Sequence, residues 1–363
     1  MDVHAALIPR EYYDHRGIRY TQRDHLRYTK ELFEYVRTYL GGDAPVFSEW
    51  GSAWLAGSMD GGAFNAGHRG PPTPGQAHAR YPFVEQIFHG RMQHWSVGEH
   101  GTNYTGQHAD PDSRLRRRLA LNVLHGRNEL LPAYSHHIRQ NLTDNTFRLF
   151  MYYITAGLTT ALGTTEMTSV NFEGNNLLRQ QIQYDNGATV RVNQDKDAYH
   201  VQGYELPRWG YLAQGNGFLQ YRATVTGVDQ PVDFVQCPEY TFAYASQPHD
   251  FGPVALQGAV AIRRAGSGLQ IFEIVKPTGT VQIRPAKLDF ECDANTPCRV
   301  VRLIDNIERK ADHPVSMNRD GSVHIVPAPE RDVLRYELGE VAPIGSAPYS
   351  RGPTSESWPG GAG

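Results

Sequence analysis

One stretch of this sequence decides the fold of its second half: Gln181-Ile182-Gln183-Tyr184-Asp185-Asn186-Gly187-Ala188-Thr189-Val190-Arg191-Val192-Asn193. Apolar and polar residues alternate on both sides of the Asn186-Gly187 pair, which is the two-residue period of a half-buried strand. Asn-Gly favours the tight turn that joins two antiparallel strands. The stretch therefore predicts a β-hairpin over residues 181–193.

Strand patterns continue toward the C-terminus, and no clear helical pattern follows residue 175. They fall at 218–225, 254–263, 269–274, 281–283, 299–303, 322–326 and 334–338. This spacing is typical of antiparallel sandwiches. We expect one β-sandwich over 176–280 and a small immunoglobulin- or fibronectin-like one over 281–344. Residues 345–363 are rich in Gly, Pro and Ser and predict a disordered tail.

Toward the N-terminus, helical and strand patterns alternate. A helix is predicted after Thr21, because Asp24 completes a capping box and Gly41-Gly42 supplies a stop signal. Short buried strands are predicted at Val46-Phe47 and over 83–90, and helices over 112–124 and 147–162. This alternation predicts the second half of a (β/α)8 barrel over residues 1–175. The expected fold class is α/β plus all-β.

Composition and charge exclude some partners. The 363 residues carry a net charge of −3 with 20% charged residues, so no basic surface for nucleic acid is implied. No apolar run reaches the roughly 20 residues of a membrane-spanning helix. The first nine residues lack the pattern of a signal peptide and resemble the end of a strand. We expect the chain to be the C-terminal portion of a longer protein, and a chain truncated in this way would be inactive alone. The sequence indicates no oligomeric state.

The three cysteines do not decide between an oxidising and a reducing environment. Cys292 and Cys298 bracket a turn-rich insert that could bring them within disulfide range, and Cys237 is then left over. Reduced thiols that only fill space are an equal alternative.

Two carboxylates follow predicted strands that should be neighbours in the sheet, Asp2 and Glu49. Neighbouring strands lie about 4.8 Å apart, and carboxyl groups about 5–5.5 Å apart are typical of retaining glycoside hydrolases. Trp50 and Trp54 would shield Glu49 from water, which favours a protonated acid/base. His4 lies two residues from Asp2 and should project to the same face of its strand.

These two motifs resemble a known family of enzymes. Asp2-Val3 and Ser48-Glu49-Trp50-Gly51 are similar to the catalytic motifs of glycoside hydrolase family 101, the endo-α-N-acetylgalactosaminidases, and of related barrel enzymes. Ser48 stands where the family usually has Thr. The resemblance implies a retaining glycosidase with Asp2 as nucleophile and Glu49 as acid/base, acting on complex glycans. From this class we expect an extracellular or periplasmic protein.

The remaining site predictions concern substrate contacts and alternatives. We expect no cofactor, and we expect sugar contacts from His4, Trp50, Trp54, Asp60, His89 and Trp95. A non-catalytic glycan-binding or structural module is the alternative from a different class. A metal-assisted hydrolase is a further alternative, with Asp2, His4, Glu49 and His89 as ligands, although no His-x-His or His-Glu-x-x-His pattern supports it.

Overall fold

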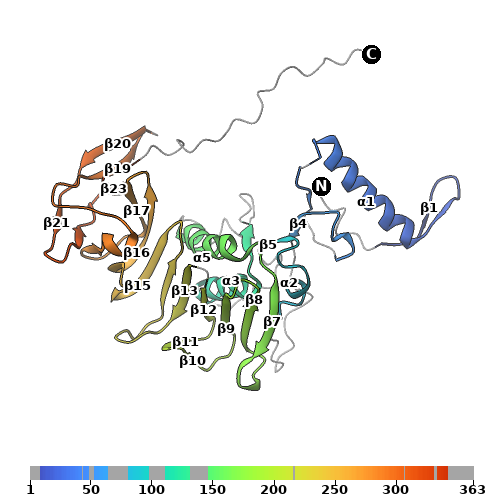
Figure 1. The fold of residues 1–363 in the computed structure, drawn as a ribbon, viewed down its shortest axis with the longest axis horizontal. Helices are drawn as coiled ribbons and strands as arrows, with labels where there is room; N and C mark the ends of the chain where they lie inside the picture. Colours follow the sequence, from blue (N-terminus) through green and yellow to red (C-terminus); the bar gives the residue numbers. More distant parts are fainter. Residues whose placement is uncertain are drawn as a thin grey trace, which may run out of the picture. The chain divides into compact units, whose positions relative to one another are not determined.

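The structure is a computed structural model that describes residues 9–42, 44–48, 53–63, 81–97, 111–130, 146–215, 217–305, 307–330 and 333–341. The chain divides into two compact units, Met1–His249 and Asp250–Gly363, and each is described by itself. Figure 1 shows the ribbon of the chain, with labels on many of its helices and strands.

The first unit begins with a hairpin and a long helix. Strands β1 (Tyr12–Tyr13) and β2 (Arg19–Tyr20) pair antiparallel and lead into α1 (Gln22–Tyr39), as Figure 1 shows. The predicted capping box is confirmed: Thr21 Oγ1 accepts a hydrogen bond from the backbone N–H of Asp24 at 3.2 Å, and the Asp24 carboxylate accepts one from the N–H of Thr21 at 3.0 Å.

One face of α1 packs on a small apolar core. Phe33 is fully buried there with Val46, Leu55, Met59 and Met92. This core joins α1 to the four-stranded parallel sheet that follows in the chain. Its strands, in spatial order, are β3 (Phe47–Ser48), β4 (Gly61–Ala63), β5 (Gln93–Val97) and β6 (Asn128–Leu130).

The prediction of a strand over residues 83–90 is wrong. Phe83–Phe88 is a helix, α2, and the next strand of the parallel sheet, β5, begins later at Gln93. A short apolar run does not by itself separate a strand from a buried helical turn, because both bury most of their side chains.

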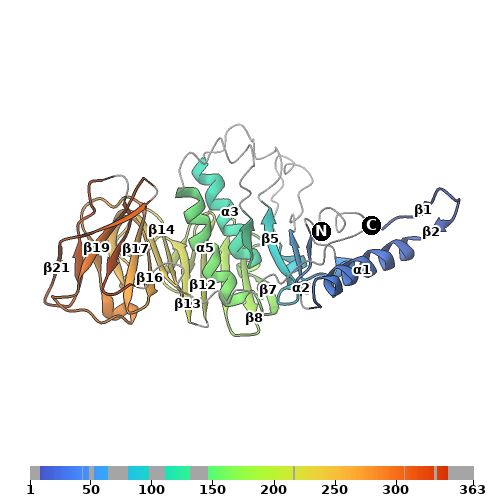
Figure 2. The same cartoon turned by 90° about the horizontal axis from the view of Figure 1, so that it is seen from above.

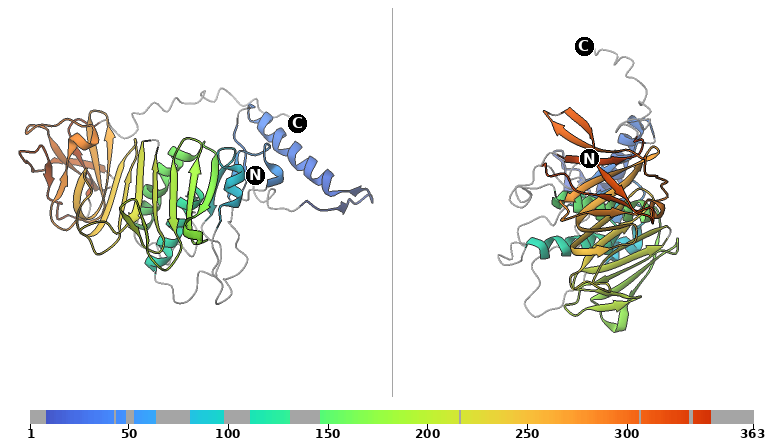
Figure 3. Two further views of the ribbon diagram at one scale, coloured as in Figure 1. Left: turned by 60° about the horizontal axis from the view of Figure 1, so that its bottom comes forward. Right: turned by 90° about the vertical axis from the view of Figure 1, so that its left-hand side faces the viewer.

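The larger sheet in the described part of the first unit is antiparallel, and Figure 3 shows it from two further sides. In spatial order its strands are β15 (Thr241–Asp250), β14 (Val232–Gln236), β13 (Phe218–Ala223), β12 (Gly210–Gly215), β9 (Thr189–Asn193), β8 (Arg179–Tyr184) and β7 (Met167–Phe172). The hairpin predicted from the Asn-Gly turn is confirmed, because β8 and β9 pair antiparallel with Gln183 opposite Thr189. A separate small hairpin joins β10 (Tyr199–Val201) to β11 (Tyr204–Leu206).

Two helices cover one face of this sheet (Figure 2). Helix α3 (Pro111–His125) packs against β9 and β12, and α5 (Thr146–Leu162) packs against β13 and β14. The Tyr240 hydroxyl donates to the carbonyl of Tyr153 at 2.6 Å. Gln220 Nε2 donates to the carbonyl of Ile154 at 2.8 Å. Polar side chains thus fix α5 on the sheet at two points.

The predicted fold class, the second half of a (β/α)8 barrel followed by one or two β-sandwiches, is wrong. The described chain is mostly β, and its largest element in the first unit is the antiparallel sheet. The helices predicted over 112–124 and 147–162 do form, as α3 and α5. Both pack on strands of the antiparallel sheet, and α5 also contacts β6 of the parallel sheet, so they do not build the outer ring of a barrel.

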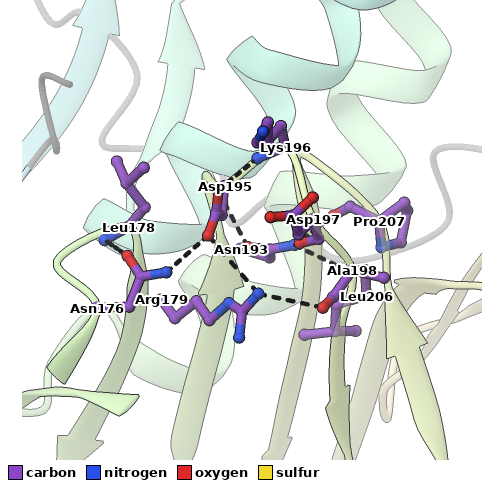
Figure 4. Close-up of polar contacts among 10 residues, drawn as sticks. All are labelled: Asn176, Leu178, Arg179, Asn193, Asp195, Lys196, Asp197, Ala198, Leu206 and Pro207. Atoms are coloured by element: carbon purple, nitrogen blue, oxygen red, sulfur yellow. Dashed lines mark hydrogen bonds and ion pairs between the residues drawn. The ribbon is translucent and has the colours of Figure 1, made fainter. Parts of the chain in front are cut away.

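A polar turn closes one end of the antiparallel sheet (Figure 4). Asn193 Nδ2 donates to the carbonyls of Asp197 and Leu206, each at 2.9 Å. The Asp195 carboxylate accepts from Asn176 Nδ2 at 2.6 Å. The side chains therefore satisfy backbone groups that the turn takes out of the strand ladder.

Eight antiparallel strands lie in the described part of the second unit. In spatial order, β20 (Ile307–Asp312), β19 (Cys298–Ile304), β23 (Val333–Leu338), β17 (Gly268–Val275) and β16 (Val254–Ala265) form one row. Strand β18 (Val281–Ile283) pairs with β16 and β22 (Val323–Ile325), and β22 pairs with β21 (Val315–Met317). The Tyr336 hydroxyl donates to Glu273 at 2.8 Å in its interior.

The three cysteines are free thiols. Cys237 and Cys298 are buried, whereas Cys292 is half-buried. Among the helices of the described residues, none combines the length and the apolar character needed to cross a membrane.

Candidate active site

The parallel sheet offers one edge at which four strands end together. Strands β3, β4, β5 and β6 end at Ser48, Ala63, Val97 and Leu130. Because all four run parallel, their carboxyl ends lie at the same edge. In open sheets with parallel strands, ligands bind outside this edge.

The predicted catalytic pair lies outside the described residues, and so do His4 and Trp50. The roles of Asp2 and Glu49 therefore stay predictions. Glu49 directly follows Ser48, the last residue of β3, in the chain. The side chain of Ser48 is buried at 7% exposure, and within the described residues its Oγ has no hydrogen-bond partner.

The two other tryptophans of the prediction occupy different parts of the first unit. Trp95 lies in β5, and its backbone is in register with Ala63 of β4 and Asn128 of β6. It is therefore in the middle of the parallel sheet. Trp54 lies in a short 3-10 helix, Ala53–Leu55, and packs half-buried against the apolar core under α1.

Asp60 lies at the amino end of β4, the opposite edge from the candidate site. Its Oδ2 accepts the backbone N–H of Val46 at 2.7 Å and lies 3.1 Å from the Arg37 guanidinium. The backbone carbonyl of Asp60 accepts from Gln93 at 2.8 Å. Asp60 thus ties three elements together: the chain leading into β3, helix α1 and strand β5. Its predicted sugar contact stays a prediction.

His89 follows α2 and is buried at 6% exposure. Its Nδ1 lies 2.7 Å from the carbonyl of Thr165, and its Nε2 lies 3.2 Å from the carbonyl of Gly126. The ring packs edge-on against Tyr184, with centroids 5.2 Å apart. Both ring nitrogens are thus engaged by backbone groups from separate segments. The predicted sugar contact of His89 also stays a prediction.

A buried charged cluster lies beside His89, and the sequence analysis missed it. Glu85 of α2 is 2.9 Å from His125 Nδ1 and 2.6 Å from the Arg127 guanidinium. All three side chains are nearly inaccessible to water. Burial raises the pKa of Tyr184, and the negative charge of Glu85 raises it further. The one sequence signal was a carboxylate inside the apolar run Phe83–Phe88.

This cluster holds together three parts of the chain around the parallel sheet. Glu85 is on α2, His125 is the last residue of α3, and Arg127 directly precedes β6. Removing one partner of such a buried set leaves an uncompensated charge in a low-dielectric interior. We interpret the cluster as structural, because it links α2, the end of α3 and the start of β6.

A pocket of about 500 Å³ opens next to α2. Its walls include His89, Arg91 and Glu166, and Arg91 Nε donates to the Glu166 carboxylate at 2.9 Å. Both charged side chains are exposed and neutralise each other. In this pocket the Glu166 carboxylate is therefore paired with Arg91.

Within the described ranges, no three His, Cys, Asp or Glu side chains gather in a way that could hold a metal ion. Three of the four ligands of the metal-assisted alternative, Asp2, His4 and Glu49, lie outside those ranges.

No family model matches the chain, and no curated protein matches its sequence.

Proposed function

We propose that the chain is a retaining glycoside hydrolase in which Glu49 is the acid/base and Asp2 the nucleophile. The observation that carries the proposal is that β3 is a strand of a parallel sheet and ends at Ser48, one residue before Glu49. The carboxyl edge of parallel strands is where ligands bind. The resemblance of the two short motifs to family 101 supplies the roles of the two acids.

The proposed role of Glu49 as an acid requires a partly desolvated carboxyl group. Desolvation favours the protonated form of a carboxyl group. An acid/base of a retaining enzyme needs that form in the first step.

The reaction has two displacements. Asp2 attacks the anomeric carbon while Glu49 donates its proton to the glycosidic oxygen, and the bond between that carbon and the leaving oxygen breaks. The glycosyl ester on Asp2 is then hydrolysed by a water whose proton Glu49 removes. The anomeric configuration is retained after two inversions. The aromatic side chain of Trp95, carried by β5, is the proposed stacking platform for the sugar.

Substrate and leaving-group dependence test the role of Glu49. The full chain is assayed with 4-nitrophenyl N-acetyl-α-D-galactosaminide and with 4-nitrophenyl α- and β-glycosides of glucose and galactose. Glu49→Gln should lower turnover about 10²–10⁴-fold for glycosides whose leaving group needs a proton. With the 2,4-dinitrophenyl glycoside, the rate of the first displacement should fall less, because this leaving group departs without protonation.

Azide separates an acid/base from a binding residue. With Glu49→Ala, azide should restore turnover and yield a glycosyl azide of retained configuration, because this small anion attacks without a general base. Asp2→Asn should not respond in this way. The matched control is Glu34→Gln, an exposed carboxylate on α1 that should leave turnover unchanged.

Two results would overturn the proposal. The first is turnover of Glu49→Gln and Asp2→Asn within a few fold of the unaltered chain. The second is the absence of hydrolysis of every glycoside in the panel by the unaltered chain, which would favour a non-catalytic glycan-binding module.

A further inference from the structure

A second pocket lies between the β1–β2 hairpin and α1, the elements that precede β3 in the chain. Its volume is about 610 Å³, within the range of small-molecule sites. One wall is the segment Arg10–Tyr12, and the other is formed by His25, Tyr28, Thr29 and Leu32 of α1. All of these residues belong to the first unit.

Two exposed tyrosines, Tyr12 and Tyr28, line this pocket. Tyr12 is 42% exposed and Tyr28 is 44% exposed, although both are large side chains with apolar faces. Tyr12 stacks on Tyr20 with ring centroids 4.9 Å apart and an interplanar angle of 11°. Tyr20 in turn contacts Tyr28 edge-on at 6.0 Å. The rings therefore support each other while Tyr12 and Tyr28 remain accessible, an arrangement typical of a binding surface.

Hydrogen-bonding groups lie beside the rings. His25 Nδ1 accepts the backbone N–H of Arg10 at 3.4 Å, so the neutral ring carries its proton on Nε2, which is a donor. Thr29 Oγ1 donates to the carbonyl of His25 at 2.9 Å, and its lone pairs can accept. The pocket thus combines a donor, an acceptor and aromatic rings.

We propose that this pocket binds a pyranose sugar. One face of such a ring presents C–H groups that pack on an aromatic side chain, and its rim presents hydroxyls that donate and accept hydrogen bonds. Tyr12 and Tyr28 match the first feature, and His25 and Thr29 match the second. The site does not depend on the proposed hydrolase function, because it uses none of the residues assigned to catalysis.

The charges argue against an organic cation, the other ligand that aromatic pockets take. Both oxygens of the Glu11 carboxylate accept from the Arg19 guanidinium at 2.9 Å, so its charge is compensated. Arg10 adds a further positive charge to the wall. A quaternary ammonium ion would therefore meet net repulsion.

Local contacts hold the pocket in shape before a ligand arrives. Asp14 Oδ1 accepts the backbone N–H of Arg16 at 2.9 Å and of Ile18 at 3.0 Å, which fixes the turn of the hairpin. The capping box of Thr21 and Asp24 fixes the start of α1. A preformed site loses less conformational entropy on binding.

Saturation-transfer NMR with the full chain tests the site. The probes are methyl β-D-galactopyranoside and methyl β-D-glucopyranoside, and tetramethylammonium chloride is the contrasting ligand. We expect at least one glycoside to bind. Tyr12→Ala and Tyr28→Ala should each weaken binding on the order of tenfold, which corresponds to the roughly 1.5 kcal/mol of a strong aromatic contact.

Matched controls lie on the same helix. Tyr35 and Tyr39 are 65% and 71% exposed, stack on each other and line no part of this pocket, so Tyr35→Ala and Tyr39→Ala should bind the probes like the unaltered chain. Far-UV circular dichroism shows whether each variant keeps its helix.

The proposal is overturned by any of three results. These are no saturation transfer to either glycoside at tens of millimolar, equal binding by Tyr12→Ala and the unaltered chain, and binding of tetramethylammonium without binding of the sugars.

Discussion

Arg116 on α3 and Asp233 on β14 form an ion pair at 2.8 Å, although they are 117 positions apart in the chain. Asp233 is fully buried, and Arg222 reaches the same carboxylate oxygen at 2.8 Å from the neighbouring strand. One oxygen thus holds the helix and the sheet together. The guanidinium of Arg116 also lies over the rings of Phe150 and Tyr244, at 5.5 Å from each.

Replacing the shared carboxylate should strongly destabilise the first unit. Asp233→Asn removes the negative charge that Arg116 and Arg222 share in the buried interior. We expect a loss of about 3–5 kcal/mol in the free energy of unfolding. Urea denaturation followed by tryptophan fluorescence measures it. Asp229→Asn, an exposed position, should change it by no more than about 0.5 kcal/mol.

Gly126→Ala should destabilise through contact as well as through backbone strain. Gly126 has φ +60°, and a Cβ there would lie 2.6 Å from His89 Nε2 and 2.8 Å from the Tyr184 hydroxyl. Gly187, at φ +83° in the Asn-Gly turn, has no atom within 4 Å of its Cβ position. Gly187→Ala should therefore lower the free energy of unfolding by about 1–2 kcal/mol through backbone strain alone. Gly126→Ala should lower it by about 1–3 kcal/mol more, because of the close contacts. Equal melting temperatures for the two variants would contradict this contact.

The turn of Figure 4 should make stability depend on pH below 4. The hydrogen bond from Asn176 holds the pKa of Asp195 below its ordinary value of 3.8. Because the folded state binds the proton less tightly than the unfolded state, this contribution is fully present above the ordinary pKa. It is lost as the pH falls through the lowered pKa.

Unfolding free energies of the unaltered chain and of Asp195→Asn, measured from about pH 6 downward, test this dependence. The difference between them should stay constant above about pH 5 and shrink below pH 4. A difference that does not change with pH would show that the carboxylate of Asp195 titrates normally in the folded chain.

The cysteines should differ in reactivity. Burial raises the pKa of Cys237 to about 11 and that of Cys298 to about 12. Since the thiolate is the reacting form, both should resist iodoacetamide at pH 8 in the folded chain. Cys292 is half-buried and should react first. Mass spectrometry of timed digests measures the order, and labelling of Cys298 as fast as Cys292 would contradict the burial of β19.

Local signals in the sequence were sufficient for individual elements. The Asn-Gly turn predicted the pairing of β8 with β9, and Thr21 with Asp24 predicted the start of α1, because both depend on neighbouring residues. The helices α3 and α5 were also predicted from their apolar spacing. These features need no knowledge of distant contacts.

The assembly of these elements was not predictable in the same way. The apolar faces of α3 and α5 fit a parallel or an antiparallel sheet equally well. Their actual partners are β9, β12, β13 and β14 of the antiparallel sheet, together with β6 of the parallel sheet. The expectation of a barrel therefore failed at the level of packing. The sequence also did not show that Glu85, His125 and Arg127 are buried together, since about forty residues separate the first from the other two.

The residues of the candidate site were predicted from the sequence, and the structure describes the surroundings of only some of them. The short strand predicted at Val46-Phe47 forms one residue later, as β3, and it belongs to a parallel sheet. Asp60 and His89, in contrast, are held by backbone groups, contacts that spacing in the sequence does not reveal.

The pocket between the hairpin and α1 has a consequence for the order of folding. Its walls come from one continuous segment, and its contacts close only short loops, such as Asp14 with Ile18 and Thr21 with Asp24. Short loops cost little closure entropy, whereas a pair 117 positions apart costs more and forms slowly. We therefore expect the amino-terminal segment to acquire its shape early and the Arg116–Asp233 contact to form among the last.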